Sequence, residues 1–122
     1  MKLIFVVDDN ATNLTTVEEL LENHYRVIAL SSAEQMFKAL EKFKPDLILL
    51  DVAMPEMDGF EALKKLRANS EHADIPVVYL SGLVDHVSEE HGLELGARDF
   101  VPKPFSKDVL LNSIAKVLSG EA

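Results

Sequence analysis

Five short apolar segments, each separated from the next by a segment of helical periodicity, constrain the fold of this chain most. They are KLIFVV (2–7), YRVIAL (25–30), DLILL (46–50), PVVYLS (76–81) and RDFVP (98–102). Four of them are rich in β-branched or aromatic residues, as strands are. The first, third and fourth are almost continuously apolar, which indicates strands covered on both faces. The alternation of strands and helices predicts an α/β fold with a parallel sheet.

The intervening segments repeat apolar residues at the spacing of an amphipathic helix. We predict helices over 13–24, 32–43, 60–69, 85–95 and 106–118. Ser32 and Gln35 have the pattern of a capping box, Gly96 would end the fourth helix and Ser106 would cap the last. Gly92 inside the fourth helix costs about 1 kcal/mol relative to alanine, so this helix should be the least stable. The prediction is one domain over residues 1–122, with five helices flanking the sheet.

Composition and charge exclude several classes of function. The chain has 122 residues and a formal net charge of −9, which argues against direct binding to nucleic acid or anionic lipid. No apolar stretch approaches the ~20 residues that span a bilayer, and the N-terminal segment does not resemble a signal peptide. Cysteine is absent, which excludes disulfides and thiolate metal sites and suits the cytoplasm. We therefore expect a cytoplasmic protein.

Polar side chains directly follow four of the five predicted strands. In a parallel α/β sheet, ligands bind beyond the carboxyl ends of the strands. Here those ends supply three carboxylates, a hydroxyl and an ammonium group, from Asp8, Asp9, Asp51, Ser81 and Lys103. Each residue alone has an ordinary explanation, because strand ends often carry turn and helix-capping residues. Asp58, before Gly59, keeps that structural interpretation.

Electrostatic repulsion favours a shared function for the three aspartates. Two carboxylates ~4 Å apart repel by about 4 kcal/mol at an effective dielectric of 20. Three are stable together only with bound protons or a cation. Lys103 supplies one positive charge, and a site of oxygen ligands with open positions suits Mg²⁺. The four histidines are scattered over helices and loops, and we expect none of them to be a ligand. Aspartate, Mg²⁺, a hydroxyl and a lysine together suit phosphoryl transfer to an aspartate nucleophile.

Four motifs, in this order, resemble the receiver domain of two-component response regulators, of the chemotaxis-receiver type. They are VVDDN (6–10), DLILLDVAMPEMDG (46–59), VVYLSG (77–82) and DFVPKPF (99–105), which span nearly the whole chain. The resemblance implies a flavodoxin-like, doubly wound (βα)5 fold with strand order 2-1-3-4-5. It also implies that Asp51 accepts a phosphoryl group from the phosphohistidine of a sensor histidine kinase or of a histidine phosphotransfer domain.

The same resemblance assigns the metal site. Asp9, Asp51 and the backbone carbonyl of Ala53 would ligate Mg²⁺, for which Mn²⁺ is able to substitute. Asp8 would act through a water molecule. Lys103 would bind the phosphoryl group, and the bond from Lys103 to the following proline would be cis.

The resemblance further implies a conformational switch. Ser81 would move toward the phosphoryl group, and Phe100 would rotate into the space that Ser81 leaves. This change would alter the face formed by the fourth helix, fifth strand and fifth helix, and so control an effector protein or an output domain outside this chain. The domain would be a monomer or a phosphorylation-dependent dimer. It would catalyse its own phosphorylation and dephosphorylation, without turning over an external substrate. Ala53 and Leu83 are apolar, so we expect neither to position a hydrolytic water.

Three other functions fit the sequence less well. A magnesium-dependent phosphatase with an aspartyl nucleophile would carry D-x-D after its first strand, where this chain has adjacent aspartates. A flavodoxin-like electron carrier would need a phosphate-binding loop there, and DDNATN lacks its composition. A pseudo-receiver would bind partners without accepting phosphate, although every acceptor-site residue is present here. Phosphorylation of Asp51 would distinguish a receiver from a pseudo-receiver.

Overall fold

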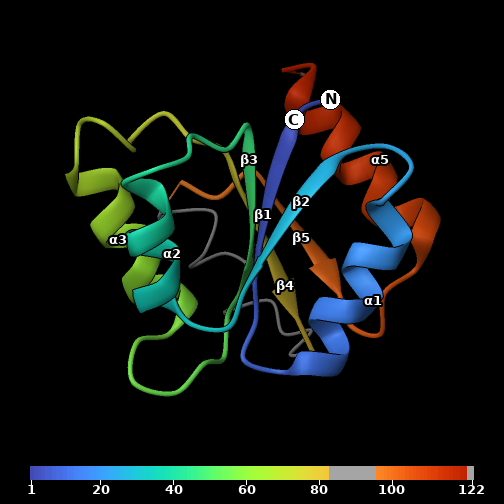
Figure 1. The fold of residues 1–122 in the computed structure, drawn as a ribbon, viewed down its shortest axis with the longest axis horizontal. Helices are drawn as coiled ribbons and strands as arrows, with labels where there is room; N and C mark the ends of the chain where they lie inside the picture. The colour runs from blue at the N-terminus through green and yellow to red at the C-terminus, as the bar shows by residue number, and fades with distance from the viewer. Residues whose placement is uncertain (83–95, 121–122) are drawn as a thin grey trace.

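The structure, a computed structural model, describes residues 1–82 and 96–120 (Figure 1). Five strands form one sheet in the order β2-β1-β3-β4-β5, and every neighbouring pair is parallel. The strands are β1 (Leu3–Val7), β2 (Arg26–Leu30), β3 (Leu47–Asp51), β4 (Val77–Ser81) and β5 (Asp99–Pro102). Each lies within one residue of its predicted bounds. The predicted α/β fold and strand order are therefore confirmed.

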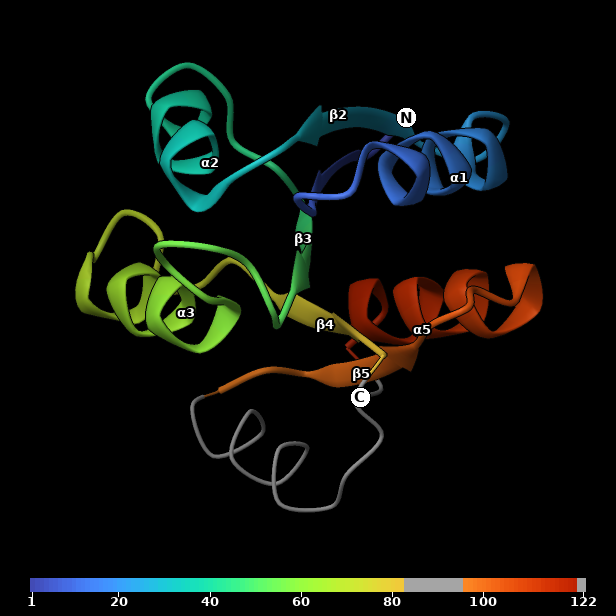
Figure 2. The ribbon, with the colours of Figure 1, turned by 90° about the horizontal axis from the view of Figure 1, so that it is seen from below.

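Helices cover both faces of this sheet (Figure 2). Helices α2 (Ala33–Leu40) and α3 (Gly59–Ala68) lie on one face, and α1 (Ala11–Leu21) and α5 (Lys107–Leu118) lie on the other. The predicted helix over 85–95, with Gly92, lies outside the described residues, as does Leu83. None of the helices described is long and apolar enough to cross a membrane.

The three central strands are buried along their whole length, as their continuous apolar sequences predicted. Their side chains alternate between two cores. Phe5, Ile48 and Tyr79 belong to the core that includes residues of α2 and α3. Ile4 and Leu49 belong to the core that includes residues of α1 and α5. Because packing on both sides fixes these strands, their carboxyl ends have fixed positions at one edge of the sheet.

Helix α1 begins and ends earlier than the predicted range of 13–24. Its cap is Asn10, whose side-chain oxygen accepts a hydrogen bond from the N–H of Asn13 at 3.0 Å. At the other end, the N–H groups of His24 and Tyr25 both bond to the carbonyl of Leu21 at 2.9 Å, which turns the chain toward β2. Apolar periodicity alone did not show this early turn.

Helix α2 ends at Leu40, whereas its apolar periodicity predicted an end at Phe43. The N–H groups of Lys42 and Phe43 both bond to the carbonyl of Ala39, at 3.0 and 2.9 Å, so the chain tightens into a turn. The Phe43 side chain is 39% exposed, and its ring centre lies 6.0 Å from the guanidinium carbon of Arg26. The residue that suggested a longer helix is thus a surface aromatic beside a cation.

Candidate functional site

The polar residues predicted from the strand ends come together in one pocket at the carboxyl edge of the sheet. The pocket is lined by Asp8, Asp9, Asn10, Asn13, Asp51, Ala53, Ser81, Gly82 and Lys103. Asp51 is the last residue of β3 and Ser81 the last of β4, while Asp8 and Lys103 directly follow β1 and β5. The sheet therefore positions the carboxylates, the hydroxyl and the ammonium group through four of its strands.

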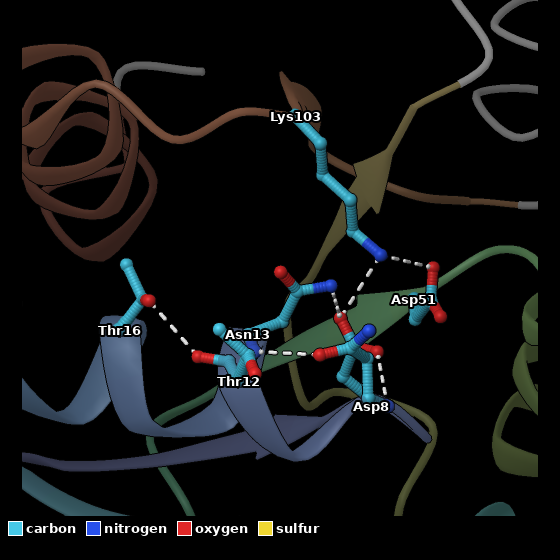
Figure 3. Close-up of polar contacts among 7 residues, drawn as sticks. Asp8, Thr12, Asn13, Thr16, Asp51 and Lys103 are labelled. Carbon is cyan, nitrogen blue, oxygen red and sulfur yellow. Dashed lines mark hydrogen bonds and ion pairs between the residues drawn. The ribbon is translucent and has the colours of Figure 1, made fainter.

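Lys103 connects two buried carboxylates across this pocket (Figure 3). Its Nζ lies 2.9 Å from Oδ2 of Asp8 and 3.0 Å from Oδ1 of Asp51. Asp8 is fully buried and Asp51 is 3% exposed. The backbone N–H of Lys103 donates to the carbonyl of Ser81 at 2.9 Å, and the Lys103–Pro104 bond is cis, as the resemblance implied. One ammonium group thus compensates two carboxylates.

Two asparagines, which sequence reasoning missed, complete the surroundings of Asp8. The N–H of Asn10 donates to Oδ1 of Asp8 at 2.9 Å, and Nδ2 of Asn13 donates to Oδ2 at 3.2 Å. Figure 3 shows Asn13 reaching Asp8 from the first turn of α1. The available signal was the pair of asparagines three residues apart, directly after the two aspartates. Both oxygens of Asp8 are therefore held by donors from the chain.

The pKa values of Asp51 and Lys103 reflect the presence of one ammonium group between two buried carboxylates. Burial raises the pKa of Asp51 to about 6; the hydrogen bond from Lys103 opposes this rise, and the nearby Asp8 carboxylate adds to it. Burial alone would lower the pKa of Lys103, but its hydrogen bonds to Asp8 and Asp51 outweigh burial and raise that pKa. The lysine therefore stays protonated, while the Asp51 carboxylate is stabilised by any further cation that approaches.

The donor set in the pocket fits a hard divalent cation. Asp8, Asp9 and Asp51 each offer one oxygen, and these oxygens all lie within 4.8 Å of one another. Opposite ligands of an octahedral Mg²⁺ lie about 4 Å apart, so small side-chain movements would bring the three oxygens around one ion. Asp9 is exposed, and both Asp9 and Ala53 line the pocket. The residues present therefore suit Mg²⁺.

The two predicted switch residues lie on one face of the sheet, but only Ser81 lines the pocket. Ser81 is 3% exposed. Phe100 is half-buried and packs on Tyr79, its partner in the register of β4 and β5, with ring centres 5.1 Å apart and an interplanar angle of 51°. Because alternate residues of a strand share a face, Ser81 lies on the same face as Tyr79 and Phe100.

The loop after β3 is closed tightly onto Asp51. The N–H of Gly59 donates to the carbonyl of Val52 at 2.8 Å. A Cβ on Gly59 would clash with the backbone carbonyl oxygen of Asp51 and would lie 3.0 Å from the Cα of Val52. Asp58 caps α3 by accepting the N–H of Glu61 at 2.9 Å, which confirms its structural interpretation. A glycine at position 59 is thus required for the chain to fold back beside Asp51.

Comparison with known proteins matches residues 4–115 to the response regulator receiver domain. Protein PilH of Pseudomonas aeruginosa is 31% identical over 121 residues, which cover 98% of this chain and 100% of PilH. The alkaline phosphatase synthesis transcriptional regulatory protein PhoP of Bacillus subtilis is 42% identical over 106 residues, which cover 86% of this chain and 43% of PhoP. The chain spans about half the length, or less, of several other curated relatives that it matches.

A solved structure gives the same result. The receiver domain of the sensor histidine kinase PA1611 of Pseudomonas aeruginosa superposes with a TM-score of 0.84 at 29% identity, covering 98% of each chain. That domain was solved with a magnesium ion coordinated in its active-site cleft. The sheet order, the acidic pocket at its carboxyl edge and the family match agree: this chain belongs to the receiver domain family of two-component response regulators.

Proposed function

We propose that this chain is a phosphorylation-dependent switch in which Asp51 accepts a phosphoryl group from the phosphohistidine of a sensor histidine kinase or a histidine phosphotransfer domain. The observation that carries the proposal is the position of the Asp51 carboxylate. It stands at the end of a fully buried central strand, 3.0 Å from the Lys103 ammonium, in a pocket that also holds Asp8 and Asp9. A carboxylate and an ammonium group therefore lie side by side, as the proposed transfer requires.

The proposed transfer is a displacement at phosphorus. A carboxylate oxygen of Asp51 attacks the phosphorus, the P–N bond breaks, and its electron pair stays on the imidazole nitrogen of the donor. The product is an acyl phosphate on Asp51. Lys103 turns its ammonium toward a phosphoryl oxygen, and the Ser81 hydroxyl, which lines the pocket, donates to another. Attack of water on the phosphorus then releases inorganic phosphate and restores the carboxylate.

The reaction would require Mg²⁺ or Mn²⁺. Asp9, Asp51 and the carbonyl of Ala53 would hold the ion directly, with Asp8 holding it through water. When bound, the ion supplies positive charge against the phosphoryl oxygens. Asp8 would also keep the ion-bound water oriented, because Asn10 and Asn13 fix both of its oxygens.

The output of the switch would pass through Ser81 and Phe100. Movement of Ser81 toward the phosphoryl group changes the space on the sheet face that it shares with Tyr79 and Phe100. Phe100 then turns inward, and the face that includes β5 and α5 changes for an effector protein or an output domain. We place this signalling in the cytoplasm, in a monomer or a phosphorylation-dependent dimer.

A small phosphodonor tests the proposal without a known kinase. Wild type and Asp51→Asn are incubated with phosphoramidate and MgCl₂, and intact mass spectrometry counts the phosphoryl groups. Wild type should gain one acid-stable, hydroxylamine-sensitive group, and Asp51→Asn should gain none. Asp58→Asn is a matched control, because asparagine retains the helix cap. EDTA should abolish the labelling. Labelling of Asp51→Asn at the wild-type level would contradict the assignment of Asp51.

A further inference from the structure

A groove that phosphoryl transfer does not use lies between α2 and the loop after β3. Its volume is about 460 Å³, enough for one or two large side chains, and its apolar lining comes mainly from Phe37 of α2 and from Pro55 and Met57 of the loop. Phe37 and Met57 are half-buried and pack against the core that includes α2 and α3. The floor of the groove is therefore apolar, and its side chains Phe37 and Met57 are fixed by packing against the core.

The rim of the groove is acidic on both sides. On one side, Glu34 lies on α2 and Glu41 directly follows it; on the other, Glu56 lies in the loop after β3 and Glu61 on α3. All four are exposed. Lys38 is the lysine of the lining; its ammonium lies 3.3 Å from Glu34, and both side chains are more than 70% exposed, so this pair contributes little. The rim thus combines four carboxylates with one ammonium group.

We propose that this groove docks a basic amphipathic segment of a partner protein, with one bulky apolar side chain flanked by lysine or arginine. The apolar side chain gains free energy by covering Phe37 and Met57, while the flanking cations approach the acidic rim. A second copy of this chain is a poor occupant, because two chains of net charge −9 repel each other at such a rim. Nucleic acid is excluded for the same reason.

The groove and the phosphoacceptor pocket are lined by nearby residues of the same loop. Ala53 lines the pocket and Pro55 lines the groove, two residues farther along the same loop. The hydrogen bond from Gly59 to Val52 closes that loop against Asp51. A partner in the groove therefore contacts the segment that directly follows the reactive carboxylate, although docking itself does not depend on phosphorylation.

The test uses unphosphorylated protein and a defined peptide. The probe is a capped pentapeptide with phenylalanine at its centre and two lysines on each side, titrated into ¹⁵N-labelled protein. We expect amide shifts concentrated in residues 33–41 and 55–61. The double variant Glu41→Lys/Glu56→Lys should weaken binding by about tenfold, because it reverses one charge on each side of the groove. A peptide with glutamates in place of the lysines should not bind.

The matched control is Glu18→Lys/Glu22→Lys, which makes the same change in net charge at another acidic surface, on and just after α1. Its affinity for the peptide should stay within about twofold of wild type, since distant exposed charges are screened. Equal losses in the two double variants would show only general attraction to an acidic protein and would overturn the proposal. Shifts centred outside the groove, or no binding by wild type, would also overturn it. None of these outcomes depends on Asp51 accepting a phosphoryl group.

Discussion

Lys103 and Asp8 form an ion pair at 2.9 Å, and the same ammonium lies 3.0 Å from Asp51. Two buried carboxylates therefore share one cation, while the third aspartate of the pocket, Asp9, is exposed. This sharing determines how the stability and metal affinity of the domain should respond to substitution and pH.

Replacing Lys103 with methionine should destabilise the metal-free protein and increase its affinity for Mg²⁺. The variant leaves Asp8 and Asp51 without their ammonium group, at a cost of about 1–3 kcal/mol. It also removes a cation that competes with the metal ion. Urea unfolding without metal and calorimetric titration with MgCl₂ measure the two effects. Lys107→Met, an exposed change at the start of α5, should alter neither. An unchanged Mg²⁺ affinity in Lys103→Met would contradict competition.

The contribution of Asp51 to the stability of the metal-free protein should fall as pH rises from about 4 to about 6. Burial raises the pKa of Asp51 from 3.8 to about 6, so the folded state keeps a proton in this range that the unfolded state has lost. The stabilisation is complete below pH 3.8, is lost through pH 6, and amounts to ~3 kcal/mol at most. An asparagine at this position would not titrate, so the Asp51→Asn variant should not lose stability over this pH range and should be more stable than wild type at pH 7.

Urea unfolding of wild type and Asp51→Asn from pH 4 to pH 7.5, without metal, measures this effect as the difference between the two proteins. That difference should grow with pH and then level off. The exposed Asp108→Asn variant in the first turn of α5 serves as the control for loss of a carboxylate. A difference that is independent of pH would show that burial does not shift the titration of Asp51.

Replacing Asn13 with leucine should weaken Mg²⁺ binding by about tenfold, as loss of a residue that orients a ligand commonly does. Leucine has a similar size but cannot donate to Oδ2 of Asp8, where the Asn13 amide bonds at 3.2 Å. Thr16→Val is the matched control on the same helix, because the Thr16 hydroxyl bonds to the carbonyl of Thr12 and does not reach Asp8 (Figure 3). Calorimetry should show wild-type affinity for Thr16→Val; the same result for Asn13→Leu would refute the role of Asn13.

Replacing Gly59 with alanine should destabilise the protein by about 1–3 kcal/mol, because the added methyl group has no space beside the carbonyl of Asp51. Helix propensity alone predicts the opposite sign, since alanine is the better helix former. Gly82→Ala is the control, because a Cβ there has no atom of the described residues within 4 Å. Urea unfolding of the two variants distinguishes close packing from a general effect of glycine replacement.

The sequence predicted the sheet and the positions of the site residues well because both depend on local patterns. A strand buried on both faces reads as a continuous apolar run, and β1, β3 and β4 have such runs. The site residues directly follow strands whose parallel packing brings their ends together, so Asp8, Asp51 and Lys103 needed no further information to be placed at one edge.

Features that depend on individual hydrogen bonds, which apolar periodicity does not reveal, were not predicted. Asn10 and the two aspartates before it are all good helix caps; in the structure Asn10 is the cap, and its N–H donates to Asp8. Phe43 continues the apolar periodicity of α2 and so predicted a longer helix, but the helix ends at Leu40. The bond from Asn13 to Asp8 requires α1 to start where it does, which the pattern did not show.

The ion pairs of Lys103 also have a consequence for the way the domain meets a metal ion. A divalent ion that binds in the pocket would have to displace the ammonium of Lys103, which already pairs with Asp8 and Asp51. The net free energy of ion binding would then be the free energy gained with the ion minus the free energy lost with the Lys103 ion pairs. Under the proposed function, the lysine would raise the concentration of the ion that binding requires. At low concentration Asp51 would stay paired with Lys103, and at high concentration Lys103 would be released to meet the incoming phosphoryl group.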